Sequence, residues 1–257
     1  MQTVLSDSNP FGIDRYGFLW EILAHLDKGR HLDYGVYDGD VIKKLASSGV
    51  ISEGFGVDLN KNSLDSAVDI PANVVLECII KGSPLPFSDG FFDSISVLDV
   101  IEHMHDQESI LLEFKRVLRK GGKLIITVPK RHVFSLLDVG NFKFLFPRLH
   151  KAAYISRNSR KEYKRRYIDC ENGLFGDIEK EKMWHQHFSK VELSSLLAKC
   201  GFKVVQIDGT GFFTRPLLLL ALVLPFTKKA ILKLKNVDDK RFAKMNLFCV
   251  AEHKVDE

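Results

Sequence analysis

Cysteine is scarce in this sequence, and the cysteines present lie far apart. The four of them include no CxxC pair and no spacing typical of metal ligands, which argues against a disulfide framework and a zinc site; they are Cys78, Cys170, Cys200 and Cys249. No signal-peptide pattern precedes them. We therefore expect a reducing, cytoplasmic setting.

Long hydrophobic runs are also missing. The most apolar stretch, residues 216–226, is shorter than the roughly 20 apolar residues that span a bilayer. Neither an internal repeat nor a low-complexity tract is visible. The 257 residues are 45% hydrophobic, which is enough to bury a full core. These features predict one domain, residues 1–257, that carries insertions.

Acidic residues are nearly absent from one stretch of the chain. The net charge is only +4, but residues 148–166 contain eight Lys or Arg side chains and a single acid, Glu162. This asymmetry favours an anionic surface or substrate nearby, with a solvated basic helix as the alternative. No recognised nucleic-acid-binding module accompanies the stretch, so we expect no nucleic-acid partner.

Apolar bursts alternate with helical patterns in the first half of the chain. This order is typical of a parallel sheet with crossover helices. We expect strands at 30–35, 53–58, 73–80, 91–100 and 123–129, the last closed by Pro129. Helices are expected at 16–26, 41–48 and 107–119, with Gly121 and Gly122 ending the last of these.

The second half begins irregularly and ends regularly. Residues 130–182 are basic, aromatic and too long for a simple connection. Ser189 and Glu192 then have the spacing of a capping box, which predicts a helix up to Lys199 that Gly201 ends. Strands are expected at 202–208 and 246–253, in a pattern that suits an antiparallel pair.

The stretch HLDYGVYDG, residues 31–39, has the composition of a ligand-binding turn. Gly35 and Gly39 follow the first expected strand, where ligands of open parallel sheets bind and where glycine lets the backbone approach them. Asp58 ends the second strand, where a carboxylate can accept hydrogen bonds from a ribose diol. The spacing is not G-x-G-x-x-G, which disfavours a nicotinamide-dependent oxidoreductase.

Five segments together resemble a known family. They are HLDYGVYDG, GVDLN, LPFSDGFFDSISVLDVIEHM, EFKRVLRKGGKLIITVPK and HFSKVELSSLLAKCGFKV. In order and spacing they are similar to the motifs of class I S-adenosylmethionine-dependent methyltransferases, in the branch acting on small-molecule and lipid-like acceptors. The resemblance covers about residues 16–208 and the last strand. It implies an α/β, Rossmann-like sheet of seven strands, six parallel and one antiparallel, flanked by helices, with S-adenosyl-L-methionine as cofactor.

The resemblance also implies positions for the cofactor. Asp33 and Gly35 would lie near its methionine part, Asp58 would take the ribose hydroxyls, Leu59 would line the adenine, and Leu98 would lie beside the methionyl group. The second glycine of the turn, Gly39, completes the expected binding loop.

Two residues depart from the family pattern. Tyr37 stands in place of the middle glycine, so its ring must point away from the ligand or stack on it. Lys81 occupies the place where an aspartate usually meets the adenine amine. These departures keep open a non-catalytic protein that retains the methyltransferase fold.

Histidines near the expected strand ends are candidates for proton removal. Methyl transfer depends mainly on alignment, and a hydroxyl acceptor also needs a base whose pKa is near neutrality. His103 is the first candidate and His187 the second; ordinary structural histidines are the alternative. Asp99, Glu102 and His103 also have helical i, i+3, i+4 spacing that could suit magnesium, but capping of the next helix is preferred and we assign no metal ligand.

Two long insertions are expected to cover the acceptor. Residues 130–187 would form a basic, aromatic cover, and residues 209–245 combine an apolar block with cations, a composition typical of a membrane interface. A pocket cap, a dimer contact or an extra core helix is the alternative. The resulting hypothesis is O-methylation of a small or lipid-linked acceptor by a cytoplasmic protein that associates peripherally with an anionic membrane. The oligomeric state is left open.

Overall fold

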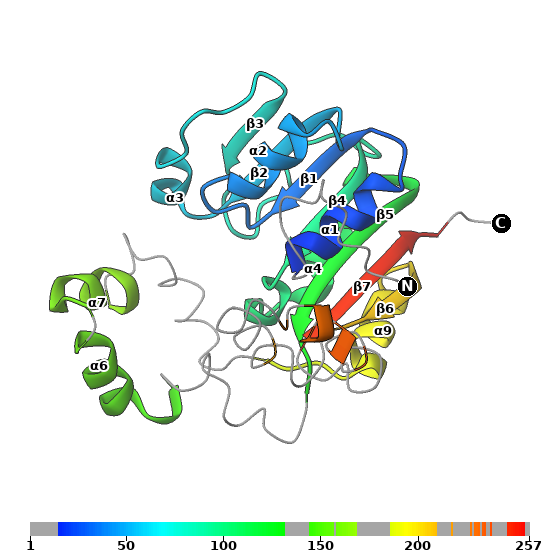
Figure 1. Ribbon diagram of the computed structural model, residues 1–257. Coiled ribbons are helices and arrows are strands. Elements are labelled where there is room, and N and C mark those ends of the chain that lie inside the picture. Colours follow the sequence, from blue (N-terminus) through cyan, green and yellow to red (C-terminus); the bar gives the residue numbers. More distant parts are fainter. Residues whose placement is uncertain are drawn as a thin grey trace.

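A seven-stranded sheet forms the centre of the molecule (Figure 1). The computed structural model describes residues 15–131, 144–156, 158–168, 186–209 and 246–254, with short pieces at 217, 227, 229–231, 233–234 and 237. The strand order is β3-β2-β1-β4-β5-β7-β6. The strands are β1 Arg30–Tyr34, β2 Glu53–Asp58, β3 Val74–Cys78, β4 Phe92–Leu98, β5 Leu118–Pro129, β6 Phe202–Asp208 and β7 Asn246–His253.

Strand β7 runs antiparallel to both of its neighbours, β5 and β6. The other neighbouring pairs of the described sheet are parallel. The expected arrangement of six parallel strands and one antiparallel strand is therefore confirmed.

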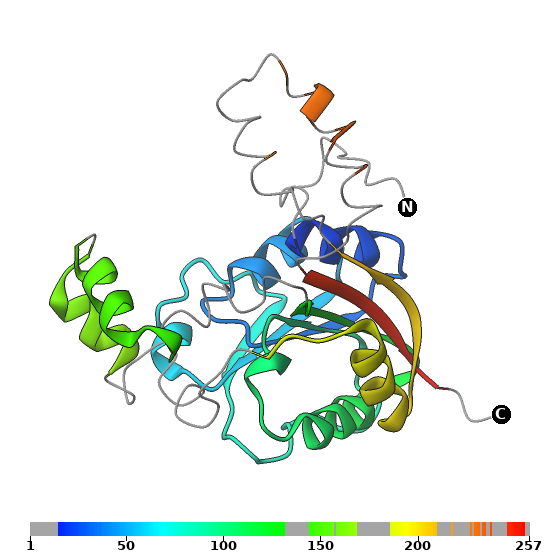
Figure 2. The same cartoon turned by 90° about the horizontal axis from the view of Figure 1, so that it is seen from below.

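Helices cover both faces of the sheet (Figure 2). Helices α1 Arg15–Ala24 and α2 Asp40–Ser47 lie on one face, and α4 Gln107–Val117 and α9 Lys190–Lys199 lie on the other. Each face has its own hydrophobic cluster, because alternate strand residues point to opposite sides. In β5, for example, Leu124 and Ile126 join the cluster under α4 and α9, whereas Ile125 joins the cluster under α1 and α2.

Most of the expected element bounds are confirmed to within a few residues. The capping box of α9 is present: Glu192 N–H donates to Ser189 Oγ at 3.1 Å, and Ser189 N–H donates to Glu192 Oε2 at 2.8 Å. One short helix, α3 Lys61–Asp65, was not expected; the side chain of Asn60 caps it by accepting from Ser63 N–H at 3.3 Å.

The expected end of α4 is wrong. The helix stops at Val117, and Leu118 already adopts an extended conformation as the first residue of β5. The Leu118 side chain is fully buried in the core, and it pairs across the sheet with Phe92. Burial of this side chain explains why the chain leaves the helix before the two glycines.

The expectation of an irregular region at 130–182 is also wrong in part. Its described portion contains two helices, α6 Pro147–Ile155 and α7 Arg160–Tyr167. Pro147 begins α6 at a position that tolerates proline, and the Ser159 side chain caps α7 by accepting from Glu162 N–H at 3.1 Å. Among the helices in the described part of the chain, none has the length and apolar character to cross a membrane.

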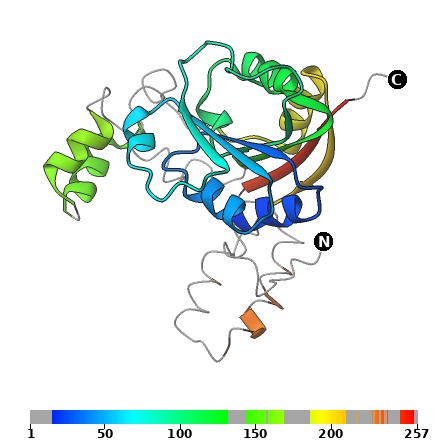
Figure 3. The same ribbon diagram turned by 90° about the horizontal axis from the view of Figure 1, so that it is seen from above.

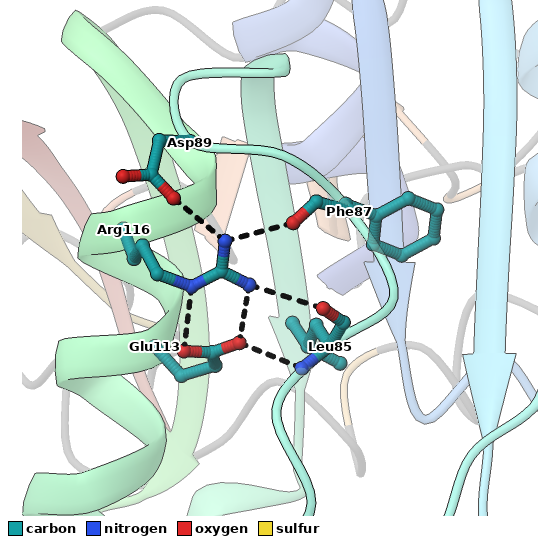
Figure 4. A network of polar contacts seen from close by, with 5 residues as sticks. All are labelled: Leu85, Phe87, Asp89, Glu113 and Arg116. Atoms are coloured by element: carbon teal, nitrogen blue, oxygen red, sulfur yellow. Dashed lines mark hydrogen bonds and ion pairs between the residues drawn. The ribbon is translucent and has the colours of Figure 1, made fainter.

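Arg116 fastens the loop before β4 to helix α4 (Figure 4). Its guanidinium donates to the carbonyl oxygens of Leu85 and Phe87 at 3.0 and 2.8 Å, and to the carboxylates of Glu113 and Asp89. Glu113 in turn accepts from the N–H of Leu85 at 2.6 Å. Hydrogen bonds to Arg116 hold the pKa of Glu113 below its usual range. This network fixes the loop that leads into the central strand of the sheet.

Candidate active site

The turn between β1 and α2 holds three residues in the left-handed backbone region. Their φ angles are 82° at Gly35, 57° at Tyr37 and 75° at Gly39. The N–H groups of Gly35 and Val36 both donate to the carbonyl oxygen of Val57, at 2.8 and 3.1 Å. The turn therefore lies directly against the end of β2.

Both glycines of this turn are required by their surroundings. A Cβ at Gly35 would lie 2.6 Å from Cγ2 of Val100, and a Cβ at Gly39 would lie 2.9 Å from Cδ1 of Leu76. Together with their positive φ angles, these approaches explain why no larger residue stands at either position.

Tyr37 takes the backbone conformation of a glycine without being one. Left-handed φ values cost an ordinary residue roughly 1–2 kcal/mol. The side chain is 47% exposed, and the Tyr37 N–H donates to Oδ2 of Asp58 at 2.8 Å. The ring therefore reaches solvent while the backbone of Tyr37 serves the site.

Asp58 is held at the end of β2 by two backbone donors. Besides Tyr37 N–H, it accepts from Asn60 N–H, which meets Oδ1 at 2.8 Å. An ionised carboxylate has about four acceptor positions, so each oxygen can still accept from a ligand. The side chain is half-buried. This arrangement suits recognition of a ribose diol at the sheet edge.

Asp33 lies on β1 beside Asp58 and is almost fully buried. Its Oδ1 accepts from the hydroxyl of Ser96 at 2.7 Å. The Ser96 hydroxyl also meets Nε2 of His31 at 2.9 Å, and Nδ1 of His31 meets the hydroxyl of Ser94 at 2.8 Å. All four side chains are buried, and they form one chain of hydrogen bonds between β1 and β4.

The chain of hydrogen bonds fixes the tautomer of His31. A serine hydroxyl has one proton to donate, and Ser96 uses it in the hydrogen bond to the Asp33 carboxylate. Ser96 must then accept from Nε2–H of His31, which leaves Nδ1 to accept from Ser94. While Asp33 is ionised, the neutral His31 ring therefore carries its proton on the nitrogen that faces Ser96, and burial, which lowers the pKa of His31, favours this neutral form.

Burial shifts the pKa values of both titratable groups in this chain. Desolvation raises the pKa of Asp33 to about 6; the Ser96 hydrogen bond and Arg15 oppose this shift, whereas the charge of Asp58 adds to it. Desolvation lowers the pKa of His31 to about 3. The site therefore contains a carboxyl group that titrates near neutrality.

Arg15, at the start of α1, reaches across to the ends of β4 and β5. It forms an ion pair with Asp99, whose other oxygen accepts from the Thr127 hydroxyl at 2.7 Å. Burial alone would lower the pKa of Arg15, but Asp99 and the Tyr16 hydroxyl raise it above its usual range. Arg15 is thus a fixed cation near Asp33.

The helical face expected for Asp99, Glu102 and His103 is not formed. Asp99 has a φ of 55°, and the 3₁₀ turn η1 covers only Ile101–His103. The Asp99 carboxylate is already engaged by Arg15 and Thr127. Within the described residues, no three His, Cys, Asp or Glu side chains are grouped closely enough to hold a metal ion.

The two segments that carry the candidate bases lie next to each other. Gln107 donates through Nε2 both to the carbonyl oxygen of Ile101, in η1, and to Oε1 of Gln186, each at 2.9 Å. His103 belongs to η1 and His187 follows Gln186, and both histidines are half-buried. Beyond Gln186, the backbone pairs with the end of β5, since Phe188 N–H donates to the carbonyl oxygen of Pro129 at 2.9 Å.

The two apolar residues expected to contact the cofactor, Leu59 and Leu98, lie near the two acids. Leu59 follows Asp58 and is half-buried, with its carbonyl oxygen 3.8 Å from Sγ of Cys78. Leu98 ends β4 two residues after Ser96, the residue that pairs with Asp33 on β1, and it is half-buried against the cluster under α1 and α2. Lys81 is exposed after β3.

Sequence reasoning missed Arg15, His31, Ser94 and Ser96. A signal was present, because His31 and Asp33 are two residues apart on an otherwise apolar strand, and Ser94 and Ser96 repeat this spacing on β4. Alternate polar residues on two buried neighbouring strands indicate a shared polar network. Arg15 gave no comparable signal.

A class of protein follows from this fold and site. In the seven-stranded sheet, β7 lies between β5 and β6, and an acid stands at or near the end of both β1 and β2. These features together define a class I methyltransferase architecture. The family model described as "Methyltransferase domain" matches residues 13–207. The chain therefore belongs to the class I S-adenosylmethionine-dependent methyltransferases, a family of enzymes whose methyl donor is S-adenosyl-L-methionine.

Curated relatives match about half of this chain. The "Ubiquinone biosynthesis O-methyltransferase" of Alkalilimnicola ehrlichii is 26% identical over 56% of this chain and 60% of that protein. The "Ubiquinone/menaquinone biosynthesis C-methyltransferase" of Syntrophotalea carbinolica is 33% identical over 45% of this chain and 51% of that protein. The chain thus spans about half to three-fifths of the length of these relatives.

A solved structure has a similar fold. The S-adenosylmethionine-dependent methyltransferase of Mesorhizobium loti has a TM-score of 0.56 and 14% sequence identity, and the match covers 93% of this chain and 98% of that one.

Proposed function

We propose that this chain transfers a methyl group from S-adenosyl-L-methionine to an oxygen of a small or lipid-linked acceptor. The observation that carries this proposal is the pair of carboxylates at neighbouring strand ends, Asp33 and Asp58, with Asp58 held by the N–H of Tyr37 at 2.8 Å. One carboxylate suits an ammonium group and the other suits a diol, which are the two polar ends of the methyl donor.

The residues of the site fit this cofactor. Asp33 and Gly35 would hold its methionine part, Asp58 would accept from the ribose hydroxyls, and Leu59 and Leu98 would contact its apolar surfaces. When bound, the cofactor supplies an electrophilic methyl group on a sulfonium. The turn at Tyr37 and Gly39 would receive it with the backbone, because the Tyr37 side chain is half in solvent.

Proton removal would fall to a histidine on the acceptor side. A phenol or alcohol loses its proton as its oxygen attacks the methyl carbon, and a neutral imidazole can take that proton. His103 and His187 are the candidates, since Gln107 joins their two segments. The relatives include both an O-methyltransferase and a C-methyltransferase, and the histidines support the oxygen acceptor.

A lipid-linked acceptor explains the two insertions best. Residues 130–187 and 209–245 would cover the acceptor, and their cations and apolar residues would favour an anionic membrane surface reached from the cytoplasm. Most of the second insertion lies outside the described residues. The curated relatives with quinone-pathway names support an acceptor of this chemical type.

Calorimetric titration with S-adenosylmethionine and S-adenosylhomocysteine tests the cofactor site. We expect both to bind, and Asp58→Ala to weaken binding by at least tenfold, as expected for loss of hydrogen bonds to a charged group. Asp65→Ala is the matched control, because Asp65 is an exposed acid on α3 paired with Lys61. Absence of binding to the folded protein would overturn the proposal.

Methyl transfer is then measured with radiolabelled donor and phenols that carry or lack a prenyl tail. We expect turnover, with His103→Asn lowering kcat by about a hundredfold or more if His103 is the base. His187→Asn is tested alongside. His25→Asn is the control, because His25 is exposed and lies just before β1, at the opposite end of the strands from the candidate site. Donor binding without turnover on any acceptor would support the non-catalytic alternative that Tyr37 raises.

A further inference from the structure

Helices α6 and α7 form a small hairpin that stands apart from the sheet in every view (Figures 1 and 3). Four aromatic rings hold the two helices together. His150 lies 4.9 Å from Tyr167 between ring centroids, Tyr154 lies 5.3 Å from Tyr167, and Tyr154 lies 5.7 Å from Tyr163. The hairpin therefore has its own internal contact, and none of its described side chains belongs to the two hydrophobic clusters of the sheet.

Several large apolar side chains of this hairpin are exposed. Helix α6 has no buried residue. Three large side chains at its beginning are more than half exposed, Leu145 at 51%, Phe146 at 54% and Leu149 at 58%. Ile168, directly after α7, is 53% exposed. A helix such as α6, with no buried residue, gains little from the hydrophobic effect unless another surface covers it.

The same hairpin is strongly cationic. Together the two helices contain seven Lys or Arg residues and one acid, Glu162. Arg148, Lys161 and Lys164 are exposed, and Lys151 lies 5.8 Å from the centre of the Tyr163 ring. The hairpin thus presents exposed apolar side chains and a concentrated positive charge on one protruding unit.

We propose that the α6–α7 hairpin is the docking surface of this protein for an anionic lipid bilayer. Cations are attracted to the headgroups, and Leu145, Phe146 and Leu149 enter the interface between headgroups and acyl chains. This inference builds on the proposed function, since a lipid-linked acceptor would be met at the same surface, but it is measured without any methyl donor.

The aromatic residues distinguish a bilayer from a nucleic acid. Single-stranded nucleic acids bind to basic surfaces on which exposed rings stack with bases. Here Tyr154, Tyr163 and Tyr167 are only partly exposed and pack on one another. The other large exposed side chains of the hairpin are aliphatic or cationic, apart from Phe146, and this composition favours lipid.

Flotation of the full chain with vesicles tests the proposal. One set contains phosphatidylcholine alone, and the other contains phosphatidylcholine with phosphatidylglycerol. We expect binding to the anionic vesicles only, and weaker binding as salt rises. The triple variant Arg148→Gln, Lys161→Gln, Lys164→Gln should lower the partition coefficient on the order of a hundredfold, at about fivefold for each cation.

Two further variants make the result specific. The control triple Lys28→Gln, Lys203→Gln, Lys254→Gln removes the same charge from exposed lysines elsewhere and should bind like the original protein. The double variant Phe146→Ser, Leu149→Ser keeps every cation and should also bind more weakly. Circular dichroism checks that each variant is folded.

The outcomes separate this inference from the proposed function. If the hairpin triple variant and the control triple variant lost vesicle binding equally, the effect would be one of general charge, and the assignment to the hairpin would be overturned. Binding to polyuridylate but not to vesicles would overturn it in favour of nucleic acid. Failure to float while S-adenosylmethionine still binds would refute the docking surface and leave the methyltransferase proposal intact.

Discussion

The hydroxyl of Ser96 on β4 donates to Oδ1 of Asp33 on β1 at 2.7 Å, directly across the two strands. Through this hydroxyl the buried imidazole of His31 is linked to the carboxylate nearest the methionine end of the proposed cofactor site. The ionisation of Asp33 therefore depends on residues inside the sheet as well as on any ligand.

His31 and Asp33 should affect the pH dependence of stability in opposite directions. The pKa of His31 falls to about 3 in the folded protein, so its contribution to stability is lost as pH drops from about 6.5. The pKa of Asp33 rises to about 6, so its contribution is present below about pH 3.8 and is lost as pH increases toward 6. Between about pH 4 and 6 the two effects nearly cancel.

Replacing His31 removes one side of this balance. We expect the free energy of unfolding of His31→Gln, relative to the original protein, to fall by about 1.4 kcal/mol for each pH unit from 4 to 6. Urea denaturation at several pH values measures this difference. His25→Gln, at an exposed site, should run parallel to the original protein. A parallel curve for His31→Gln as well would contradict the buried, neutral assignment of His31.

Donor affinity should decrease in acid because of Asp33. The proposed partner of Asp33 is the ammonium group of the donor, which requires the ionised carboxylate. Since burial raises the pKa of Asp33 to about 6, we expect the Kd to rise by up to about tenfold for each pH unit below that value. Calorimetric titration between pH 5 and 8 measures it.

Two variants assign this pH dependence to Asp33. Ser96→Ala removes a hydrogen bond that favours the ionised form, and the midpoint of the affinity curve should move to higher pH. Asp33→Asn should bind weakly at every pH and lose the acid dependence. If Asp33→Asn kept the same midpoint, another group would be responsible.

Tyr37 offers a test of backbone strain at the site. Its φ of 57° is costly for any residue with a Cβ, so Tyr37→Ala should keep this cost whereas Tyr37→Gly should relieve it. After the entropy cost of glycine is subtracted, we expect Tyr37→Gly to be more stable than Tyr37→Ala by about 0.5–1 kcal/mol. Both variants remove the ring, so thermal and urea unfolding of the pair isolates the backbone effect.

The same pair tests the role of the ring in donor binding. The Tyr37 N–H that holds Asp58 remains in both variants. We expect donor affinity to be equal to or higher than that of the original protein in Tyr37→Gly, because the side chain is 47% exposed and leaves the site to the backbone. A large loss of affinity in both variants would show that the ring itself contacts the ligand.

The strands and most helices were predictable because the residues that define each element lie within it or next to it in the sequence. Alternating apolar residues, the Ser189 capping box and the glycines of the β1–α2 turn all lie within a few residues of the element they define. The sequence also placed the acids of the candidate cofactor site at strand ends: Asp33 precedes the glycine turn after β1, and Asp58 ends β2.

Features that depend on distant residues were missed. The end of α4 is decided by burial of Leu118 against strands elsewhere in the sheet, and the polar chain of His31 is completed by Ser94 and Ser96, more than 60 positions along the chain. The ion pair of Asp99 with Arg15, 84 residues before it, was likewise not predicted. Such pairings arise only when the sheet is assembled.

The Arg116 network should contribute substantially to stability and little to donor binding. Arg116 donates to two backbone carbonyls and two carboxylates, and its side chain is 31% exposed. Loss of hydrogen bonds to a charged group costs about 1.5–3 kcal/mol, so we expect Arg116→Ala to destabilise the protein by about 2–3 kcal/mol in urea unfolding.

Arg119→Ala is the matched control for this effect. Arg119 forms an ion pair with Asp93, and its side chain is 51% exposed, so its loss should cost less than about 1 kcal/mol. Because the loop fixed by Arg116 leads into the amino-terminal end of β4, away from the strand ends that carry Asp33 and Asp58, the Kd for the donor should stay within about twofold in both variants. Equal destabilisation by the two replacements would contradict the structural role of Arg116, and a selective loss of donor affinity in Arg116→Ala would place the network in the binding site instead.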